Sequence, residues 1–247
     1  MTRFAARSPA VAHAFASALD DDVRLDGPSG HHLSRVRRLR SGELVTVADG
    51  NGTWRPYIVS VVRPGAVELH ADGEPVVEPR LEPLLAVAFA LTKAGKPELA
   101  VQKLTELGVD RIVPLQSRRS VPRWGTDRAD AAADRLQRIA VEAAAQSRRA
   151  RLPEVDTPRP LADLQGLPGL VVADPAGDDV GRVPDPSDGE WMLVIGPEGG
   201  LDPDEIAILG AAARLRIGPH VLRAETAAIA GAAVLTTRRS TARDHRP

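Results

Sequence analysis

The sequence predicts an α/β protein of two domains, a small N-terminal β-barrel followed by a parallel sheet covered by helices. Up to about Gly73, short apolar runs alternate with turn residues, which is typical of a small antiparallel barrel. Pro and acidic residues then interrupt any period over residues 72–79, as in a linker. After Pro83, buried-strand patterns alternate with helical patterns, which indicates a mostly parallel sheet.

The barrel strands are expected where β-branched and apolar residues run between turn signals. The turns contain Gly, Pro, Asn or Asp, which favour the backbone conformations of tight turns. The expected strands are Leu44–Val47, Trp54–Val62 and Val67–Leu69.

The second domain begins with a continuous apolar run, Leu84–Leu91, which suits a strand buried on both faces. Its helices are expected where apolar residues recur at helical spacing, and Pro97 and Pro203 suit the first turn of a helix. The remaining elements are expected at Pro97–Leu107 (helix), Arg111–Leu115 (strand), Asp127–Arg148 (helix), Leu170–Ala173 and Met192–Ile195 (strands), from Asp202 (helix), Arg214–Ile217 (strand) and Glu225–Arg238 (helix).

Composition excludes several classes of mechanism. The 247 residues carry a net charge of −1 and include no cysteine. The chain therefore has no disulfide, no Cys-ligated zinc and no thiolate nucleophile. No apolar run approaches the roughly 20 residues of a membrane helix, and residues 1–5 lack the apolar core of a secretory signal. We expect a cytoplasmic protein that needs neither a membrane nor a metal.

Basic residues are concentrated in two segments of this nearly neutral chain. Residues 31–40 contain four arginines, two histidines and no acid, and a second arginine-rich stretch runs over residues 117–151. Such segregation is typical of a nucleic-acid-binding protein. Solvated helix faces are the alternative explanation.

Two glycine-containing segments follow predicted strands near the C-terminus. Ile195–Leu201 reads Ile-Gly-Pro-Glu-Gly-Gly-Leu, and Ile217–Ala227 reads Ile-Gly-Pro-His-Val-Leu-Arg-Ala-Glu-Thr-Ala. Ligands of open α/β sheets bind at the carboxyl ends of strands, where glycine lets the backbone approach closely. Tight strand-to-helix turns would use the same residues. The chain has neither a dinucleotide fingerprint nor a phosphate-binding loop.

Together the two segments resemble the loops of the trefoil-knotted (SPOUT) methyltransferases. Within them, the chain is similar to the family that methylates N3 of a uridine in 16S ribosomal RNA. His32–Arg40 resembles that family's RNA-binding signature on a PUA-like barrel. Further similar signatures are Lys96–Glu98 with Gln102–Val109, and Gln146–Val155. The third departs from the family at Ala145 and Arg148, where Glu and Gly are common.

The resemblance implies a deep trefoil knot in the C-terminal domain, residues 82–243, behind a PUA-like domain over residues 1–75. It implies S-adenosylmethionine as cofactor, a homodimer, and 16S ribosomal RNA or the small ribosomal subunit as partner. Val172–Pro175 matches a third cofactor loop loosely. The implied cofactor-binding residues are Ala173, Ile195, Gly196, Glu198, Gly199, Gly200, Ile217, Gly218, Val221, Leu222 and Ala227.

The reaction requires loss of the proton on uridine N3 and alignment of that nitrogen with the methyl group. Arg223, with Arg149 from across the dimer, is expected to orient the flipped-out uracil. Glu198 and Glu225 are the alternative bases, and either could instead be structural. The RNA-binding candidates are Arg35, Arg37, Arg38, Arg40, Lys96 and Arg148.

Two other functions stay open from the sequence. A ribose 2′-O methyltransferase of the same superfamily would typically carry Ser-Leu-Asn where this chain has Glu225-Thr226-Ala227. A non-catalytic RNA-binding dimer could keep the knot as a scaffold, although the glycine loops argue against it.

Overall fold

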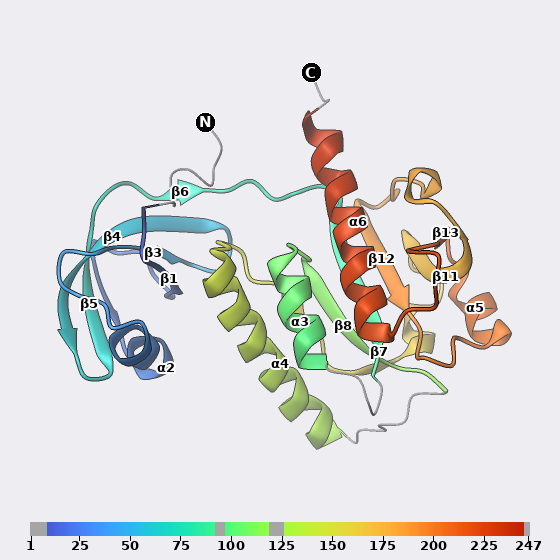
Figure 1. The fold of residues 1–247 in the computed structure, drawn as a ribbon, viewed down its shortest axis with the longest axis horizontal. Helices are drawn as coiled ribbons and strands as arrows, with labels where there is room; N and C mark the ends of the chain where they lie inside the picture. Colours follow the sequence, from blue (N-terminus) through green and yellow to red (C-terminus); the bar gives the residue numbers. More distant parts are fainter. Residues whose placement is uncertain (1–8, 92–96, 119–125, 245–247) are drawn as a thin grey trace. The chain divides into compact units, whose positions relative to one another are not determined.

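The computed structural model describes residues 9–91, 97–118 and 126–244, which form two compact units (Figure 1). The first unit comprises the described residues up to Arg80 together with Val141–Leu152, and the second comprises the remainder. The boundary between the units agrees with the separation expected between residues 75 and 82. The membership of Val141–Leu152 in the first unit was not predicted from the sequence.

The first unit contains one sheet with the strand order β1-β3-β4-β5-β2, and β6 pairs with β4. Its core contains Val47, Tyr57, Val59 and Val67, whose exposed fraction is 0%. After β2, helix α2 (Gly27–His31) continues into a π-helical turn over His32–Val36. The strands are β1 (Ala12–Phe15), β2 (Asp22–Leu25), β3 (Leu44–Ala48), β4 (Thr53–Arg63), β5 (Ala66–Ala71) and β6 (Val76–Val77).

Two features of this sheet differ from the expected small antiparallel barrel. Strands β1 and β3 are parallel, whereas the other pairs are antiparallel. Parallel neighbours need a long crossover, and the chain makes it through β2 and α2. The expected linker contains the short strand β6, which pairs with Thr53 and Trp54. Pro75 and Pro79 flank it, and proline is confined to strand ends and edges.

The segment Val141–Leu152 is held in the first unit by backbone and side-chain contacts. Leu152 N donates to Gly50 O at 2.9 Å, and Gly52 N donates to Ala150 O at 3.2 Å. Ala150 also packs in a buried cluster with Ala48 and Trp54. The long helix α4 (Thr126–Ser147) therefore contributes residues to both units.

The second unit contains a parallel sheet with the strand order β10-β8-β7-β12-β11-β13, and β9 pairs with β8. The predicted alternation of strands and helices is confirmed. Its elements are β7 (Leu84–Ala90), α3 (Pro97–Glu106), β8 (Arg111–Gln116), β9 (Glu154–Val155), β10 (Arg159–Pro160), a 3-10 turn (Leu161–Leu164), β11 (Leu170–Asp178), a second 3-10 turn (Val180–Arg182), β12 (Glu190–Ile195), α5 (Pro203–Leu209), β13 (Ala213–Leu215) and α6 (Ala224–Asp244).

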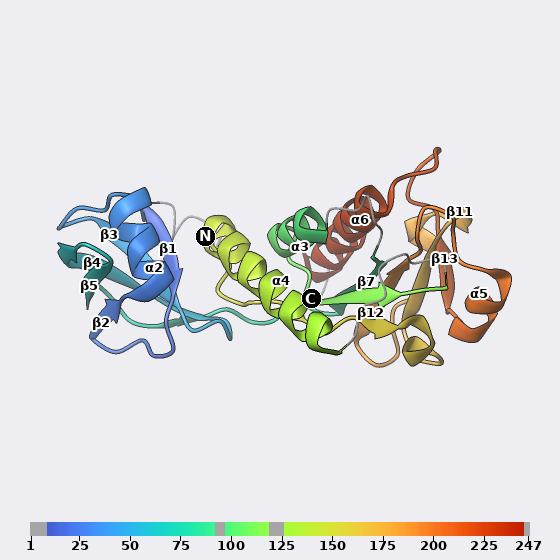
Figure 2. The same cartoon turned by 90° about the horizontal axis from the view of Figure 1, so that it is seen from below.

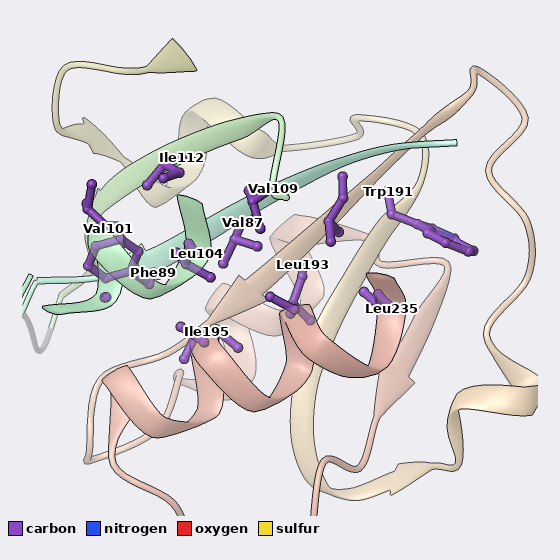
Figure 3. Packing of buried hydrophobic residues seen from close by; sticks show 14 of the residues in the cluster. Val87, Phe89, Val101, Leu104, Val109, Ile112, Trp191, Leu193, Ile195 and Leu235 are labelled. Carbon is purple, nitrogen blue, oxygen red and sulfur yellow. The ribbon is translucent and has the colours of Figure 1, made fainter. Parts of the chain in front are cut away.

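Successive residues of the central strands pack on opposite faces of this sheet, as strand geometry requires. Val87, Phe89 and Leu193 join a core cluster with residues of α3, α4 and α6. Figure 3 shows these three residues with Leu104 of α3 and Leu235 of α6. Ala88 and Val194 join the opposite cluster, which contains residues of the first 3-10 turn and α5. Figure 2 shows α3 and α6 side by side over the sheet.

The small residues of α6 allow this helix to approach the sheet closely. An added Cβ at Gly231 would lie 2.7 Å from Leu193 Cδ2 and 3.0 Å from Ile217 Cδ1. Neither distance is tolerated without movement of a neighbour. Gly231 therefore brings α6 against both β12 and the loop that follows β13.

Candidate active site

The loop after β12 turns sharply between a buried strand and a capped helix. An added Cβ at Gly196 would lie 3.0 Å from Leu201 Cγ, and Gly200 has a φ of +71°. Asp202 and Glu205 then form a capping box at α5, with Asp202 N donating to Glu205 Oε2 at 2.9 Å. The helix predicted from Asp202 is confirmed, and its cap fixes the exit of the loop.

The loop after β13 connects directly to α6. β13 ends at Leu215, two residues earlier than expected, so Ile217 and Gly218 belong to the loop. Ala227 N donates to Arg223 O at 2.8 Å, which begins the helical bonding of α6. The side chain of Val221 is 82% exposed, although it is a large apolar residue.

A third segment comes from β11, which continues past its parallel pairing with β12 and lies along β13. Gly177 allows this close approach, since an added Cβ would lie 2.7 Å from the carbonyl of Arg214. Asp174 accepts hydrogen bonds from Ala176 N at 2.8 Å and from Arg214 Nη1 at 3.3 Å.

A second ion pair supports the same extension of β11. Arg216 Nη2 lies 2.7 Å from Asp179 Oδ1, and this guanidinium lowers the pKa of Asp179. Arg216 N also donates to Asp178 O at 2.8 Å. The two chain segments are thus joined by backbone and charged contacts.

The three segments enclose one cavity of ≈ 360 Å³. This volume lies within the usual range for small-molecule sites. All eleven residues expected to bind a cofactor line it. Nine further residues line the cavity, and seven of them lie in the segments singled out from the sequence, whereas Ile206 and Leu215 lie outside these segments. The nine residues are Val172, Asp174, Pro175, Pro197, Leu201, Ile206, Leu215, His220 and Ala224.

Some of these further residues stand at recognisable positions in the sequence. Asp174 and Pro175 directly follow the apolar run of β11, and His220 lies inside the second glycine segment. The cavity has a largely apolar lining with few titratable side chains. Those that line it are Asp174, Glu198 and His220.

The four candidate catalytic residues have different surroundings. Glu198 lines the cavity and is exposed, whereas Arg223 and Glu225 do not line it. Glu225 Oε2 is buried without a hydrogen-bond partner, an arrangement that costs free energy. Arg149 belongs to the first unit, where its carbonyl oxygen accepts a hydrogen bond from His13 Nε2 at 2.9 Å.

The basic segment of the first unit is exposed around two buried leucines. Leu33 and Leu39 are 3% and 6% exposed, respectively, and they attach the segment to the core. The four candidate RNA-binding arginines between residues 35 and 40 are exposed. Arg37 Nη2 donates to Val11 O at 3.2 Å. These side chains form the arginine patch, which comprises Arg35, Arg37, Arg38 and Arg40.

Lys96 and Arg148 are the two remaining RNA-binding candidates. Lys96 lies outside the described residues. Arg148 is partly buried, has a φ of +58°, and its Nη2 donates to Ala10 O at 2.6 Å. That bond directs at least part of the Arg148 guanidinium to the first unit's own backbone.

Within residues 9–91, 97–118 and 126–244, no helix is long and apolar enough to cross a membrane. In the same part of the chain, no group of three or more His, Cys, Asp or Glu side chains could hold a metal ion.

Comparison with known families gives the class of the protein. Residues 80–236 match an RNA methyltransferase domain, and residues 25–71 match an RNA methyltransferase PUA domain. The fold, the cavity and these matches define an RNA methyltransferase with a PUA domain. The passage of the chain through a trefoil knot stays a prediction.

Individual relatives narrow this class. The chain is 36% identical to a ribosomal RNA small subunit methyltransferase E from Mycobacterium bovis over 228 residues, which cover 87% of each chain. It is 29% identical to the Bacillus subtilis protein of the same name, covering 82% of this chain and 85% of that one. The chain belongs to the family of ribosomal RNA small subunit methyltransferase E, as the sequence resemblance predicted.

Two solved structures are similar over nearly their whole length. One is a ribosomal RNA small subunit methyltransferase E from Neisseria gonorrhoeae bound to S-adenosyl methionine, with a TM-score of 0.80 and 26% identity. The other is a methyltransferase from Legionella pneumophila in complex with the cofactor SAM, with a TM-score of 0.79 and 26% identity. Each match covers 92% of this chain and 97% of the other.

Proposed function

We propose that this protein transfers the methyl group of S-adenosylmethionine to N3 of a uridine in 16S ribosomal RNA of the small subunit. The observation that carries the proposal is that all eleven expected cofactor residues line one cavity. The names of the relatives support a ribosomal RNA substrate. The resemblance of the sequence to its family implies N3 of a uridine as the atom that is methylated. We expect the enzyme to work in the cytoplasm.

The cavity suits this cofactor in its chemistry. Gly196, Gly199 and Gly218 keep side chains away from the lining, so backbone groups can contact the ligand. Ile195, Ile217 and Leu222 add apolar surface for the adenine ring. Glu198 offers a carboxylate to a cationic ligand. Bound S-adenosylmethionine would supply an activated methyl group on a sulfonium sulfur.

The protein's own task is then to bind the RNA, hold the uracil in line with the methyl group and remove the N3 proton. We assign Arg223, with Arg149 of a second copy, to orienting the uracil and stabilising its anion. This assignment requires the homodimer that the family resemblance implies. Glu198 and Glu225 differ in access, because only Glu198 lines the cavity.

We assign RNA binding to the first unit. The arginine patch offers exposed guanidinium groups, and guanidinium groups bind phosphates well. A PUA domain match over residues 25–71 includes the whole patch. Phosphate contacts of this kind position an RNA without reading its sequence.

The test is mass spectrometry of 16S ribosomal RNA from cells that contain or lack the gene. We expect N3-methyluridine at one position only when the gene is present, and its restoration by the purified protein with S-adenosylmethionine. A methyl group on a ribose 2′-oxygen would support the ribose methyltransferase instead. Absence of any modification, together with absence of cofactor binding in calorimetry, would support a non-catalytic RNA-binding protein.

A further inference from the structure

His220 is a titratable residue that lines the cavity and has no role in the function proposed above. It lies in the loop between β13 and α6, and its side chain is exposed. Glu198 lines the cavity from the loop after β12, and Asp174 lines it from β11. The further inference rests on the proposed function and concerns which of these groups removes the N3 proton.

Two carboxylates are unsuited by their surroundings. Asp174 is 17% exposed, is ion-paired with Arg214 at 3.3 Å and accepts a hydrogen bond from Ala176 N, so its oxygens already have partners. Glu225 does not line the cavity, and its Oε2 atom is buried. A base must reach the proton that it abstracts. Glu198 and His220 are the two exposed titratable residues that line the cavity.

Charge distinguishes these two groups. Uracil becomes an anion when N3 loses its proton, and a carboxylate that has accepted that proton is neutral, so it offers the anion no stabilising positive charge. An imidazole becomes positive when it accepts the proton, so it stabilises the anion that it has just formed. Imidazole side chains also titrate nearer to neutral pH than carboxylates do, which favours a base at physiological pH. Glu198 is better suited to offset the positive charge of the sulfonium.

The residue next to His220 supports a base-binding role for this rim of the cavity. Val221 lines the cavity next to His220 and is 82% exposed, so its apolar side chain is accessible to a bound base. Enzymes that modify a flipped-out base hold it between apolar or aromatic side chains. Val221 therefore offers a surface for the uracil beside the imidazole of His220.

We propose that His220 is the catalytic base for uridine N3, with Val221 supporting the uracil beside it. The N3–H proton passes to an imidazole nitrogen of His220, and the N3 electron pair forms the new bond to the methyl carbon. The bond between that carbon and sulfur breaks, and its electron pair stays on sulfur to give S-adenosylhomocysteine. The proton leaves His220 to solvent after the product departs.

The test compares the wild-type protein with His220→Ala and His220→Gln over a range of pH. The control is His70→Ala, because His70 pairs with Asp22 on the first unit, outside the cavity. Single-turnover methyl transfer by both His220 variants should fall about 100-fold or more at neutral pH. Cofactor binding, measured by calorimetry, should stay within a few-fold, and the control should match the wild type in both measurements.

Three readouts separate a base from a merely structural residue. The acid limb of the wild-type pH profile should be lost in His220→Ala. Added imidazole should restore part of the rate of that variant. RNA containing 5-fluorouridine should also narrow its deficit, because fluorine makes N3–H more acidic.

An acid limb that persists in His220→Ala but disappears in Glu198→Gln would overturn the proposal and identify Glu198 as the base. A deficit that neither imidazole nor 5-fluorouridine reduces would equally overturn it. Failure of the proposed function itself is distinguishable, because the wild-type protein would then transfer no methyl group to uridine N3.

Discussion

The buried ion pair between Arg239 and Asp110 offers the sharpest test of what holds α6 in place. Arg239 is 1% exposed, and its Nη1 lies 2.6 Å from Asp110 Oδ2. The same guanidinium donates to the backbone oxygens of Gly108 and Pro83. Asp110 Oδ2 also accepts a hydrogen bond from Leu85 N at 3.0 Å. One charged pair thus joins α6 to the start of β7 and to the turn before β8.

Asp110→Ala removes the negative partner and leaves a buried guanidinium uncompensated. Breaking a buried pair in this way costs about 3–5 kcal/mol. For a chain of this size, such a loss lowers the melting temperature by about 6–20 °C. Arg239→Met should cost a comparable amount, because it leaves the Asp110 carboxylate buried without its partner. The double variant should lose less stability than the sum of the losses in the two single variants, because both charges are then absent and no buried charge lacks a partner.

The assay is thermal and urea unfolding followed by the fluorescence of Trp191, which is 1% exposed in the core that α6 covers. Substituting Trp54 and Trp124 by Phe leaves Trp191 as the one tryptophan of the chain. A loss below about 1 kcal/mol in Asp110→Ala would refute the reasoning, since the buried charge would then have found another partner. Additive effects in the double variant would refute the coupling of the two residues.

Three further predictions concern the site and the RNA interface. Arg223→Ala or Arg149→Ala should lower methyl transfer about 100-fold or more, while calorimetry should show cofactor affinity within a few-fold of the wild type. Gly231→Ala should destabilise the second unit by about 1–3 kcal/mol in urea unfolding, because α6 leaves no room for a methyl group. Replacing Arg35 and Arg38 together by Ala should make the negative slope of log affinity against log salt shallower, by about 1 per lost phosphate contact, in RNA-binding titrations.

Each of these predictions has an outcome that would contradict it. If Arg223→Ala or Arg149→Ala lowered cofactor affinity as much as methyl transfer, the substituted arginine would bind the cofactor rather than the uracil. The control for Gly231→Ala is Gly181→Ala in the second 3-10 turn, because an added Cβ at Gly181 meets nothing within 4 Å. If both glycine variants lost the same stability, close packing would not be the cause. An unchanged salt slope would indicate that the RNA phosphates do not bind to the arginine patch.

The cofactor loops could be predicted because their signals are local. Gly196 follows β12 directly, Gly218 follows the end of β13 at Leu215 after two loop residues, and helix signals come within a few residues of each glycine. Such order along the chain indicates strand ends in a parallel sheet, where ligands bind. All eleven residues predicted from these loops and from Ala173 line the cavity. Asp174 and His220 lie in segments singled out from the sequence but were not predicted individually, because no periodicity marks the single side chains that line a cavity.

Other features depend on contacts between distant parts of the chain, which local patterns do not report. The helical period of α4 runs through Val141 without a break, so the passage from one unit to the other leaves no signal there. Arg239 resembles any helix-surface arginine until Asp110 is known to lie against it. The extension of β11 beyond Ala173 lacks the apolar pattern of a buried strand, and the reason for glycine at position 177 is apparent only from its close approach to Arg214.

The membership of Val141–Leu152 in the first unit limits how modular this protein can be. A cut after Arg80 would release a fragment without Ala150, leaving the cluster around Trp54 uncovered. Recombination that exchanged only the N-terminal segment for another PUA domain would meet the same defect. New RNA specificity would therefore have to evolve by substitution within the unit, or by exchange of two separate stretches of the gene at once.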